Sequence, residues 1–160
     1  MEKQQKTNAM LILEDAKIPY RTSSYEVDLN DLSSTHAAEM LGIDPGCMFK
    51  TLVTRGTKNG IQVFCIPSEA ELNLKQAASL SGDKRVELIA VKELLPLTGY
   101  LRGGCSPVGM KKRYPTFIDV SALNYDEIYL SAGQRGRQII VSPADIASFL
   151  KAPFLDLIHH

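Results

Sequence analysis

The chain contains 160 residues, of which 44% are hydrophobic and 22% are charged, and its formal net charge is zero. We expect one domain over residues 1–160, because a chain of this length buries about 70% of its unfolded surface without a metal or a disulfide. It contains no run of about 18 apolar residues, so we expect no membrane as a partner.

The cysteines and the N-terminal segment favour a cytoplasmic protein. Cys47, Cys65 and Cys105 are odd in number and form no C-x-x-C pair, which is typical of free thiols in a reducing compartment. The polar segment 1–6 lacks the apolar stretch of a secretion signal. His159 and His160 end the chain, and we assign them no function.

Charge is distributed unevenly along the chain. Residues 1–46 carry 4 basic and 8 acidic side chains, whereas residues 99–137 carry 6 basic and 3 acidic side chains. A basic face of this kind can bind a phosphate backbone weakly, although the run Lys111-Lys112-Arg113 is equally typical of a solvated turn.

The first elements in chain order are a helix, a strand and a short helix. The helix is predicted over 9–17, with Thr7 or Asn8 as its cap. A β-rich strand over 20–27 follows, and a helix is predicted over 36–41.

The next elements are a hairpin and a helix. Strands are predicted over 48–54 and 61–66, because Asn59-Gly60 between them is a strong signal for a tight hairpin turn. Asn73, with a glutamine three residues later, is typical of the cap of a third helix.

The second half of the chain alternates strands with loops. A strand is predicted over 85–89 and a helix over 91–95, which Pro96 is expected to break. A glycine-rich stretch follows at 99–109. Further strands are predicted over 115–119, 127–131 and 138–141, and a last helix over 144–151. The expected fold is mixed α/β, with about six or seven strands in one curled, barrel-like sheet and helices packed outside it.

The sequence lacks the motifs of common catalytic classes. It has no G-x-S-x-G elbow, no Walker loop and no H-E-x-x-H. His36 is the only histidine outside the C-terminus, and scattered cysteines do not make a zinc site. We therefore expect no metal, no cofactor and no catalytic triad.

Lys50 is the first candidate functional residue. Strand alternation places it on one face with Met48 and Leu52. Its stem could cover apolar surface while its ammonium reaches water, or the cation could stand at the mouth of a pocket and bind an anion.

The glycine-rich stretch is the second candidate. Glycines let backbone N–H groups approach a ligand closely, although the same composition is typical of an ordinary loop. Gly133-Gln134-Arg135-Gly136 is a similar, weaker signal.

Taken together, these residues resemble the YbaK/ProX family of trans-editing proteins, which also occurs as a domain of prolyl-tRNA synthetases. The resemblance runs from about residue 7 to residue 156. It rests chiefly on the motifs Phe49-Lys50-Thr51-Leu52 and Thr98-Gly99-Tyr100-Leu101-Arg102-Gly103-Gly104-Cys105-Ser106-Pro107-Val108-Gly109. Within the family the chain is most similar to the Cys-tRNA(Pro) deacylases.

The resemblance implies a set of site residues and a partner. Lys50 is the implied catalytic residue. The implied substrate-binding residues are Tyr25, Gly103, Gly104, Ser106, Pro107, Ser131 and Gly133. The implied partners are mischarged Cys-tRNA(Pro) and prolyl-tRNA synthetase, and we expect Lys111, Lys112, Arg113 and Arg135 to contact the tRNA. Two departures stand out: Cys105 replaces an aliphatic residue, and Gln138 stands where some relatives carry an acid.

A site without histidine, metal or paired carboxylates is poorly equipped to activate water. A cysteinyl ester carries its own nucleophile, because its thiol can attack its own carbonyl carbon when the substrate is held in place. Two alternatives stay open: an Ala-tRNA(Pro) deacylase that uses a positioned water, and a non-catalytic binding or regulatory module of the EbsC type.

Overall fold

A computed structural model describes residues 5–160, which form five α-helices, eight β-strands and two short 3-10 helices. The helices are α1 (Asn8–Asp15), α2 (Ser34–Leu41), α3 (Leu74–Ser81), α4 (Val91–Thr98) and α5 (Pro143–Leu150). The strands are β1 (Arg21–Ser24), β2 (Phe49–Gly56), β3 (Gly60–Pro67), β4 (Val86–Leu88), β5 (Thr116–Asp119), β6 (Ile128–Ser131), β7 (Arg137–Val141) and β8 (Phe154–Leu155). The segment 1–4, on which part of the expectation about the N-terminus rests, lies outside the described residues.

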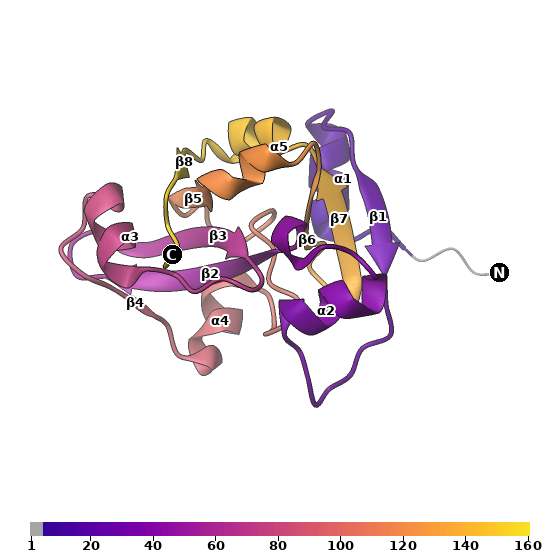
Figure 1. Cartoon of the computed structure of the whole chain (residues 1–160), viewed down its shortest axis with the longest axis horizontal. Coiled ribbons are helices and arrows are strands. Elements are labelled where there is room, and N and C mark those ends of the chain that lie inside the picture. Colours follow the sequence, from indigo (N-terminus) through magenta and orange to yellow (C-terminus); the bar gives the residue numbers. More distant parts are fainter. Residues whose placement is uncertain (1–4) are drawn as a thin grey trace.

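The strands form two sheets rather than one. A three-stranded antiparallel sheet has the order β1-β7-β6, and a five-stranded mixed sheet has the order β4-β2-β3-β5-β8. Figure 1 shows the larger sheet beside α3 and α4, and the smaller sheet beside α1 and α2. The prediction of a mixed α/β fold is confirmed.

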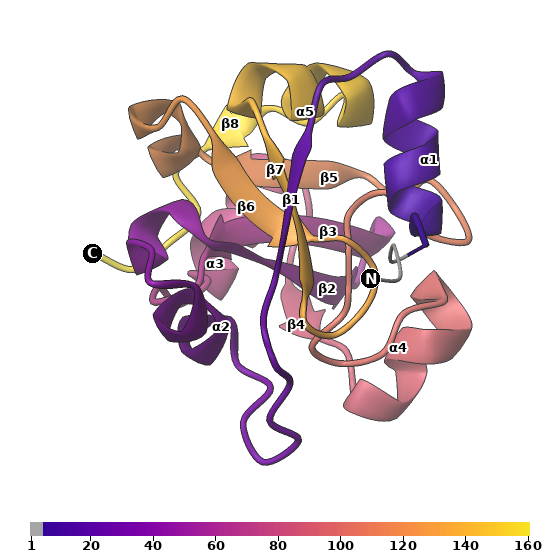
Figure 2. The same cartoon turned by 90° about the vertical axis from the view of Figure 1, so that its right-hand side faces the viewer.

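The prediction of a curled, barrel-like sheet is wrong. One isolated bridge, Met48 to Tyr129, links the two sheets, and β2 and β6 belong to different sheets. Within the described residues β1 and β6 border the smaller sheet and β4 and β8 the larger one, so neither sheet closes. Figure 2 shows the smaller sheet in front of the larger one as a separate layer. The eighth strand, β8, is a two-residue segment that the sequence did not signal.

Most helix boundaries follow local capping chemistry. The hydroxyl of Thr7 accepts a hydrogen bond from the Met10 N–H at the start of α1, and Asn73 and Ser142 cap α3 and α5 in the same way. The prediction that Pro96 breaks the fourth helix is wrong, because α4 continues to Thr98.

The continuation of α4 has a local cause. A proline so close to a helix end removes only one backbone hydrogen bond. After it, the Thr98 hydroxyl donates to the Leu94 carbonyl at 2.7 Å, and the Gly99 backbone N–H donates to the Leu95 carbonyl at 2.8 Å.

The hairpin of β2 and β3 is fastened by a buried carboxylate. Asp83 accepts hydrogen bonds from the backbone N–H groups of Lys58, Asn59 and Lys84 at 3.1, 2.8 and 2.7 Å. Burial alone would raise the pKa of Asp83, but these backbone donors outweigh it and lower the pKa to about 2. The predicted hairpin is confirmed, and its turn is held by a residue far away in sequence.

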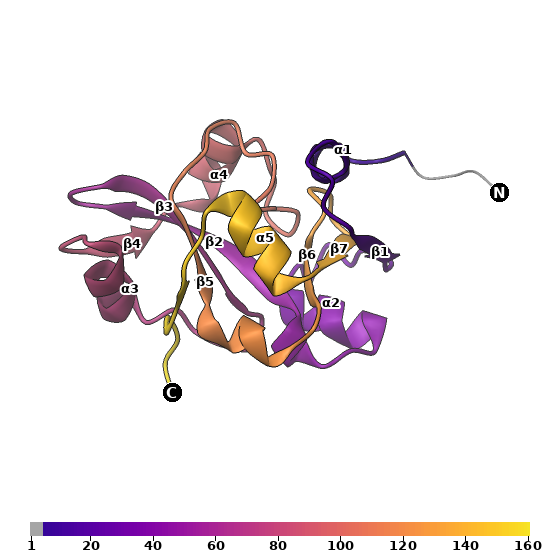
Figure 3. The same ribbon diagram turned by 90° about the horizontal axis from the view of Figure 1, so that it is seen from above.

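Three clusters of buried apolar residues form the core of the described chain. The largest joins α1 and α5 to the smaller sheet through Ile128, Leu130 and Ile139, and it reaches the larger sheet through Phe49 and Cys65. The second joins α3 to the larger sheet through Phe64 and other apolar residues. Seen from above, α5 lies across the molecule between β5 and the smaller sheet (Figure 3). In the described part of the chain, no helix has the length and apolar character needed to cross a membrane.

Candidate functional site

A cavity of about 490 Å³ lies where the two sheets separate. Its walls come from β2, from α2 and the loop before it, from the segment between β4 and α4, and from the glycine-rich loop. Ser131 and Gln138 of the smaller sheet complete the lining. The cavity therefore lies between β2 of the larger sheet and strands β6 and β7 of the smaller sheet.

One wall of the cavity is the free edge of β2. The strand pairs with β4 only over Thr54–Gly56, and the Ile89 N–H donates to the Val53 carbonyl on the same side. Since backbone groups alternate along an antiparallel strand, the N–H and C=O of Thr51 also point to this side. Within the described chain no strand pairs with Thr51 there, so its backbone donor is available to a bound molecule.

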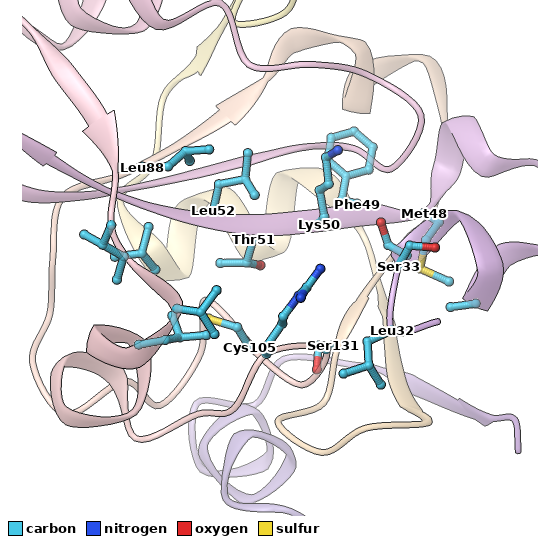
Figure 4. A pocket seen from close by; sticks show the side chains of 18 of the residues that line it. Leu32, Ser33, Met48, Phe49, Lys50, Thr51, Leu52, Leu88, Cys105 and Ser131 are labelled. Carbon is cyan, nitrogen blue, oxygen red and sulfur yellow. The ribbon is translucent and has the colours of Figure 1, made fainter. Parts of the chain in front are cut away.

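Lys50 lines the cavity from one side of this edge. Figure 4 shows Lys50, Leu52 and Leu88 on one side of β2, and Thr51, Cys105 and Ser131 on the other. Burial lowers the pKa of the Lys50 ammonium, while the charge of Glu71 opposes the shift. Among the described residues no carboxylate forms an ion pair with the Lys50 ammonium, so this half-buried cation is suited to receive an anionic or oxyanionic group.

Two glycines of the glycine-rich loop pack closely against other parts of the chain. Gly103 has a φ of +85°, and a Cβ there would lie 3.2 Å from the Cβ of Leu32. A Cβ on Gly104 would lie 3.1 Å from the backbone nitrogen of Arg135. The Arg135 Nε also donates to the Arg102 carbonyl at 2.8 Å. The loop therefore packs between Leu32, which precedes α2, and segment 133–136.

The smaller sheet presents polar side chains to the cavity. Ser131 and Gln138 are direct partners in the β6–β7 ladder, and Ser23 of β1 is the partner of Gln138 on the other side. Their face is opposite to that of Leu130 and Ile139, which belong to the core. The Ser131 hydroxyl accepts from the Gly133 N–H at 3.1 Å.

The cavity wall contains a thiol, that of Cys105. Burial raises the pKa of Cys105 to about 12, so the group is a neutral thiol at physiological pH. Burial also raises the pKa of the Tyr25 hydroxyl. The Tyr25 ring packs against the buried cluster of α2, and its backbone N–H donates to the Gly136 carbonyl at 2.9 Å. Cys105, which replaces an aliphatic residue of the motif, lines the cavity.

The electrostatic character of the cavity is cationic. Lys50 and Arg102 line it, and among the described residues no aspartate, glutamate or histidine does. No group of three or more metal-ligating side chains occurs in residues 5–160. His36 has its Nδ1 3.7 Å from an Asp31 oxygen and does not line the cavity.

The structure brings together only part of the predicted site. Four of the predicted residues line the cavity: Tyr25, Lys50, Gly103 and Ser131. Gly104, Ser106, Pro107 and Gly133 do not line it. Ser106 is fully buried and its hydroxyl accepts from the Val108 N–H, and Gly133 packs against the Tyr100 ring. These residues shape the loops behind the wall.

The predicted tRNA-binding residues fall into two places. Arg135 lies against the glycine-rich loop at Arg102. Lys112 and Arg113 line a second cavity of about 200 Å³, together with Pro107 and residues of α5. Arg113 is held there, because its guanidinium donates to the Phe149 carbonyl at 2.9 Å and stacks 5.5 Å from the Phe149 ring centre.

The sequence reasoning missed several lining residues. Arg102 lies within the glycine-rich motif, and this position could have indicated that its side chain lines the cavity. Leu32, Ser33 and Ala37 reach the cavity from α2 and the loop before it, and no sequence pattern indicated this. Thr51 belongs to the Phe49-Lys50-Thr51-Leu52 motif, but its exposure to the cavity depends on the unpaired edge of β2, which the sequence does not reveal.

Comparisons with known proteins agree with this architecture. The sequence profile of the aminoacyl-tRNA editing domain matches residues 32–149. A protein of Enterococcus faecalis strain V583, named as a candidate Cys-tRNA(Pro)/Cys-tRNA(Cys) deacylase, EbsC, is 47% identical over 154 residues, which cover 96% of this chain and 94% of that protein.

Solved structures share the fold. The structure of a candidate trans-editing enzyme for prolyl-tRNA synthetase has a TM-score of 0.80 at 24% identity, over 98% of this chain and 100% of that one. The structure of the hypothetical protein APE2540 has a TM-score of 0.84 at 23% identity, over 93% of this chain and 97% of that one. At these identities the likeness concerns the fold alone.

Proposed function

Because this chain belongs to the aminoacyl-tRNA editing domain family, we propose that it removes cysteine from mischarged tRNA(Pro), with Cys-tRNA(Cys) as a second substrate. We further propose that the reaction takes place in the cytoplasm and that prolyl-tRNA synthetase is the source of the mischarged tRNA. The observation that carries the proposal is the character of the cavity: its largely apolar lining includes the cations Lys50 and Arg102, and its described lining lacks a carboxylate or imidazole that could activate water.

The chemistry that fits such a cavity uses the substrate's own thiol. The sulfur attacks the ester carbonyl carbon, an S–C bond forms, and the bond from that carbon to the tRNA 3′ oxygen breaks. The thiol proton ends on the 3′ oxygen, so the products are a cysteine thiolactone and a free tRNA end. This step consumes no water and is lyase-like. Holding the reacting atoms together supplies roughly 7–11 kcal/mol of the barrier.

The chain's own groups then have two tasks. The free N–H of Thr51 and the Lys50 ammonium stabilise the negative charge that develops on the carbonyl oxygen or on the adjacent 3′ end. The rigid loop at Gly103 limits the space for the amino acid side chain. Since one methylene is worth only about 1–3 kcal/mol of discrimination, size alone admits serine and alanine to some degree, and thiol reactivity supplies the remaining selection.

The test is a deacylation assay with Cys-tRNA(Pro), Cys-tRNA(Cys) and Ala-tRNA(Pro) side by side. The proposal predicts release of cysteine from both cysteinyl substrates and slow or no release of alanine. Faster release of alanine would favour a hydrolase with a positioned water. No release from any substrate, with tRNA binding retained, would favour a non-catalytic binding module.

A further inference from the structure

The side chain of Gln138 is a buried polar group that the proposed chemistry does not use. The residue is only 5% exposed and lines the cavity. Its amide makes no hydrogen bond to the residues that the structure describes, and it is not one of the polar groups sealed away from solvent. The amide atoms therefore face the open cavity and are not used by a protein partner, so a bound ligand can meet them.

The position of Gln138 restricts what it can meet. It lies on β7, the central strand of the smaller sheet, between Ser23 and Ser131 and on the face turned away from the core. A tRNA is far too large to enter a cavity of about 490 Å³, so only the aminoacyl end can reach this wall. The hydrogen-bonding groups of a cysteinyl ester are its carbonyl, its thiol and its α-amino group. In the proposed reaction the carbonyl accepts hydrogen bonds from the donors of β2, and a thiol forms only weak hydrogen bonds. The α-amino group is therefore the partner left for Gln138.

The charges around the cavity decide which form of the amino group fits. The titratable groups in the lining are Tyr25, Lys50, Arg102 and Cys105, and the two that carry charge at neutral pH are cations. The carboxylates that act on Lys50 and Tyr25 are Glu71 and Asp31, which stand outside the lining. Nearby cations disfavour an ammonium ion and favour the neutral amine. An amide both donates and accepts, as a neutral amine does, whereas an ammonium only donates.

We propose that Gln138 is a specificity-determining residue that binds the α-amino group of the aminoacyl ester in its neutral form. This inference rests on the proposed deacylase function and names the part of the substrate that the smaller sheet recognises. An α-amino group has an unperturbed pKa of about 8, so both protonation states are present near neutral pH and the residue selects between them.

The test combines a substrate deletion with a residue deletion. The kcat/KM for Cys-tRNA(Pro) is compared with that for 3-mercaptopropionyl-tRNA(Pro), which keeps the thiol and lacks the amine, in the wild type and in Gln138→Met. The wild type is expected to prefer the cysteinyl substrate by about 10-fold, the scale of one hydrogen bond. In Gln138→Met the preference should vanish, because only the cysteinyl substrate slows down. Ser23→Ala, next to Gln138 but outside the lining, is the matched control and should keep the preference.

A second variant gives a readout that a structural role would not change. In Gln138→Glu a carboxylate can accept from the ammonium form, so activity on Cys-tRNA(Pro) at pH 6 relative to pH 8 should rise. The pH profile with the mercaptopropionyl substrate should not move in this variant. Equal slowing of both substrates by Gln138→Met, or an unchanged pH profile in Gln138→Glu, would overturn the inference while deacylation stands. A wild type inactive on Cys-tRNA(Pro) would instead overturn the proposed function and this inference with it.

Discussion

The replacement Lys50→Met separates the catalytic role of the cation from its packing. Methionine keeps an unbranched stem on the side of β2 that Leu52 also occupies, and it removes only the half-buried ammonium. The free energy of unfolding should therefore stay within about 0.5 kcal/mol of the wild type, or rise slightly, because a partly desolvated charge is lost. Deacylation of Cys-tRNA(Pro) should fall by about 100-fold or more, the scale of one lost oxyanion-stabilising donor.

The assay is single-turnover deacylation over a range of enzyme concentrations and pH, with a thermal melt of each variant. Burial lowers the pKa of Lys50, so the charged form is lost as pH rises through that lowered value. The wild type should show an alkaline decline that Lys50→Met lacks. A rate constant that falls at saturating enzyme places the cation at the reacting carbonyl, whereas a weaker apparent affinity alone places it on a tRNA phosphate. Full activity in Lys50→Met would refute both roles.

Three further changes test the scaffold and the tRNA surface. Gly104→Ala should shift the cavity wall and lower stability by about 1–3 kcal/mol, because its Cβ would press on the Arg135 backbone; a melt and a deacylation assay check this. Asp83→Asn should remove an acid-sensitive part of stability. The folded-state pKa of Asp83 is about 2, below the ordinary 3.8, so the wild type loses this contribution as pH falls from about 4 to 2, and the variant should not; acid titrations by circular dichroism compare them. Neutralising Lys111, Lys112 and Arg113 together should flatten the salt dependence of tRNA affinity, and an unchanged slope would place the tRNA elsewhere.

Local signals in the sequence were sufficient for most elements of the fold. Thr7, Asn73 and Ser142 cap the helices that they predict, and Asn59-Gly60 lies in the turn of the predicted hairpin. These features depend on neighbours within a few residues, which a sequence displays directly. The end of α4 was missed because a proline near the last turn removes only one hydrogen bond.

Features that depend on how distant strands meet could not be predicted in the same way. The division of the strands into two sheets depends on which distant segments pair, and only one bridge, Met48 to Tyr129, links the sheets. The cavity lies between the sheets, and the edge of β2 at Thr51 is exposed because β4 pairs only with Thr54–Gly56. The motif residues predicted for the site therefore divide into those that line the cavity, such as Gly103, and those that only support its wall, such as Ser106.

The central claim is that the substrate thiol is the nucleophile in a cavity whose described lining provides no base. The most direct measurement is single-turnover deacylation of Cys-tRNA(Pro) beside the same tRNA carrying S-methylcysteine, which cannot cyclise, and beside seryl- and alanyl-tRNA(Pro). The account predicts rapid release of cysteine only, with comparable binding of all four substrates. Release of S-methylcysteine as fast as cysteine would contradict it and require an activated water, and the residues to test would then be Tyr25 and Ser131, whose side chains line the cavity.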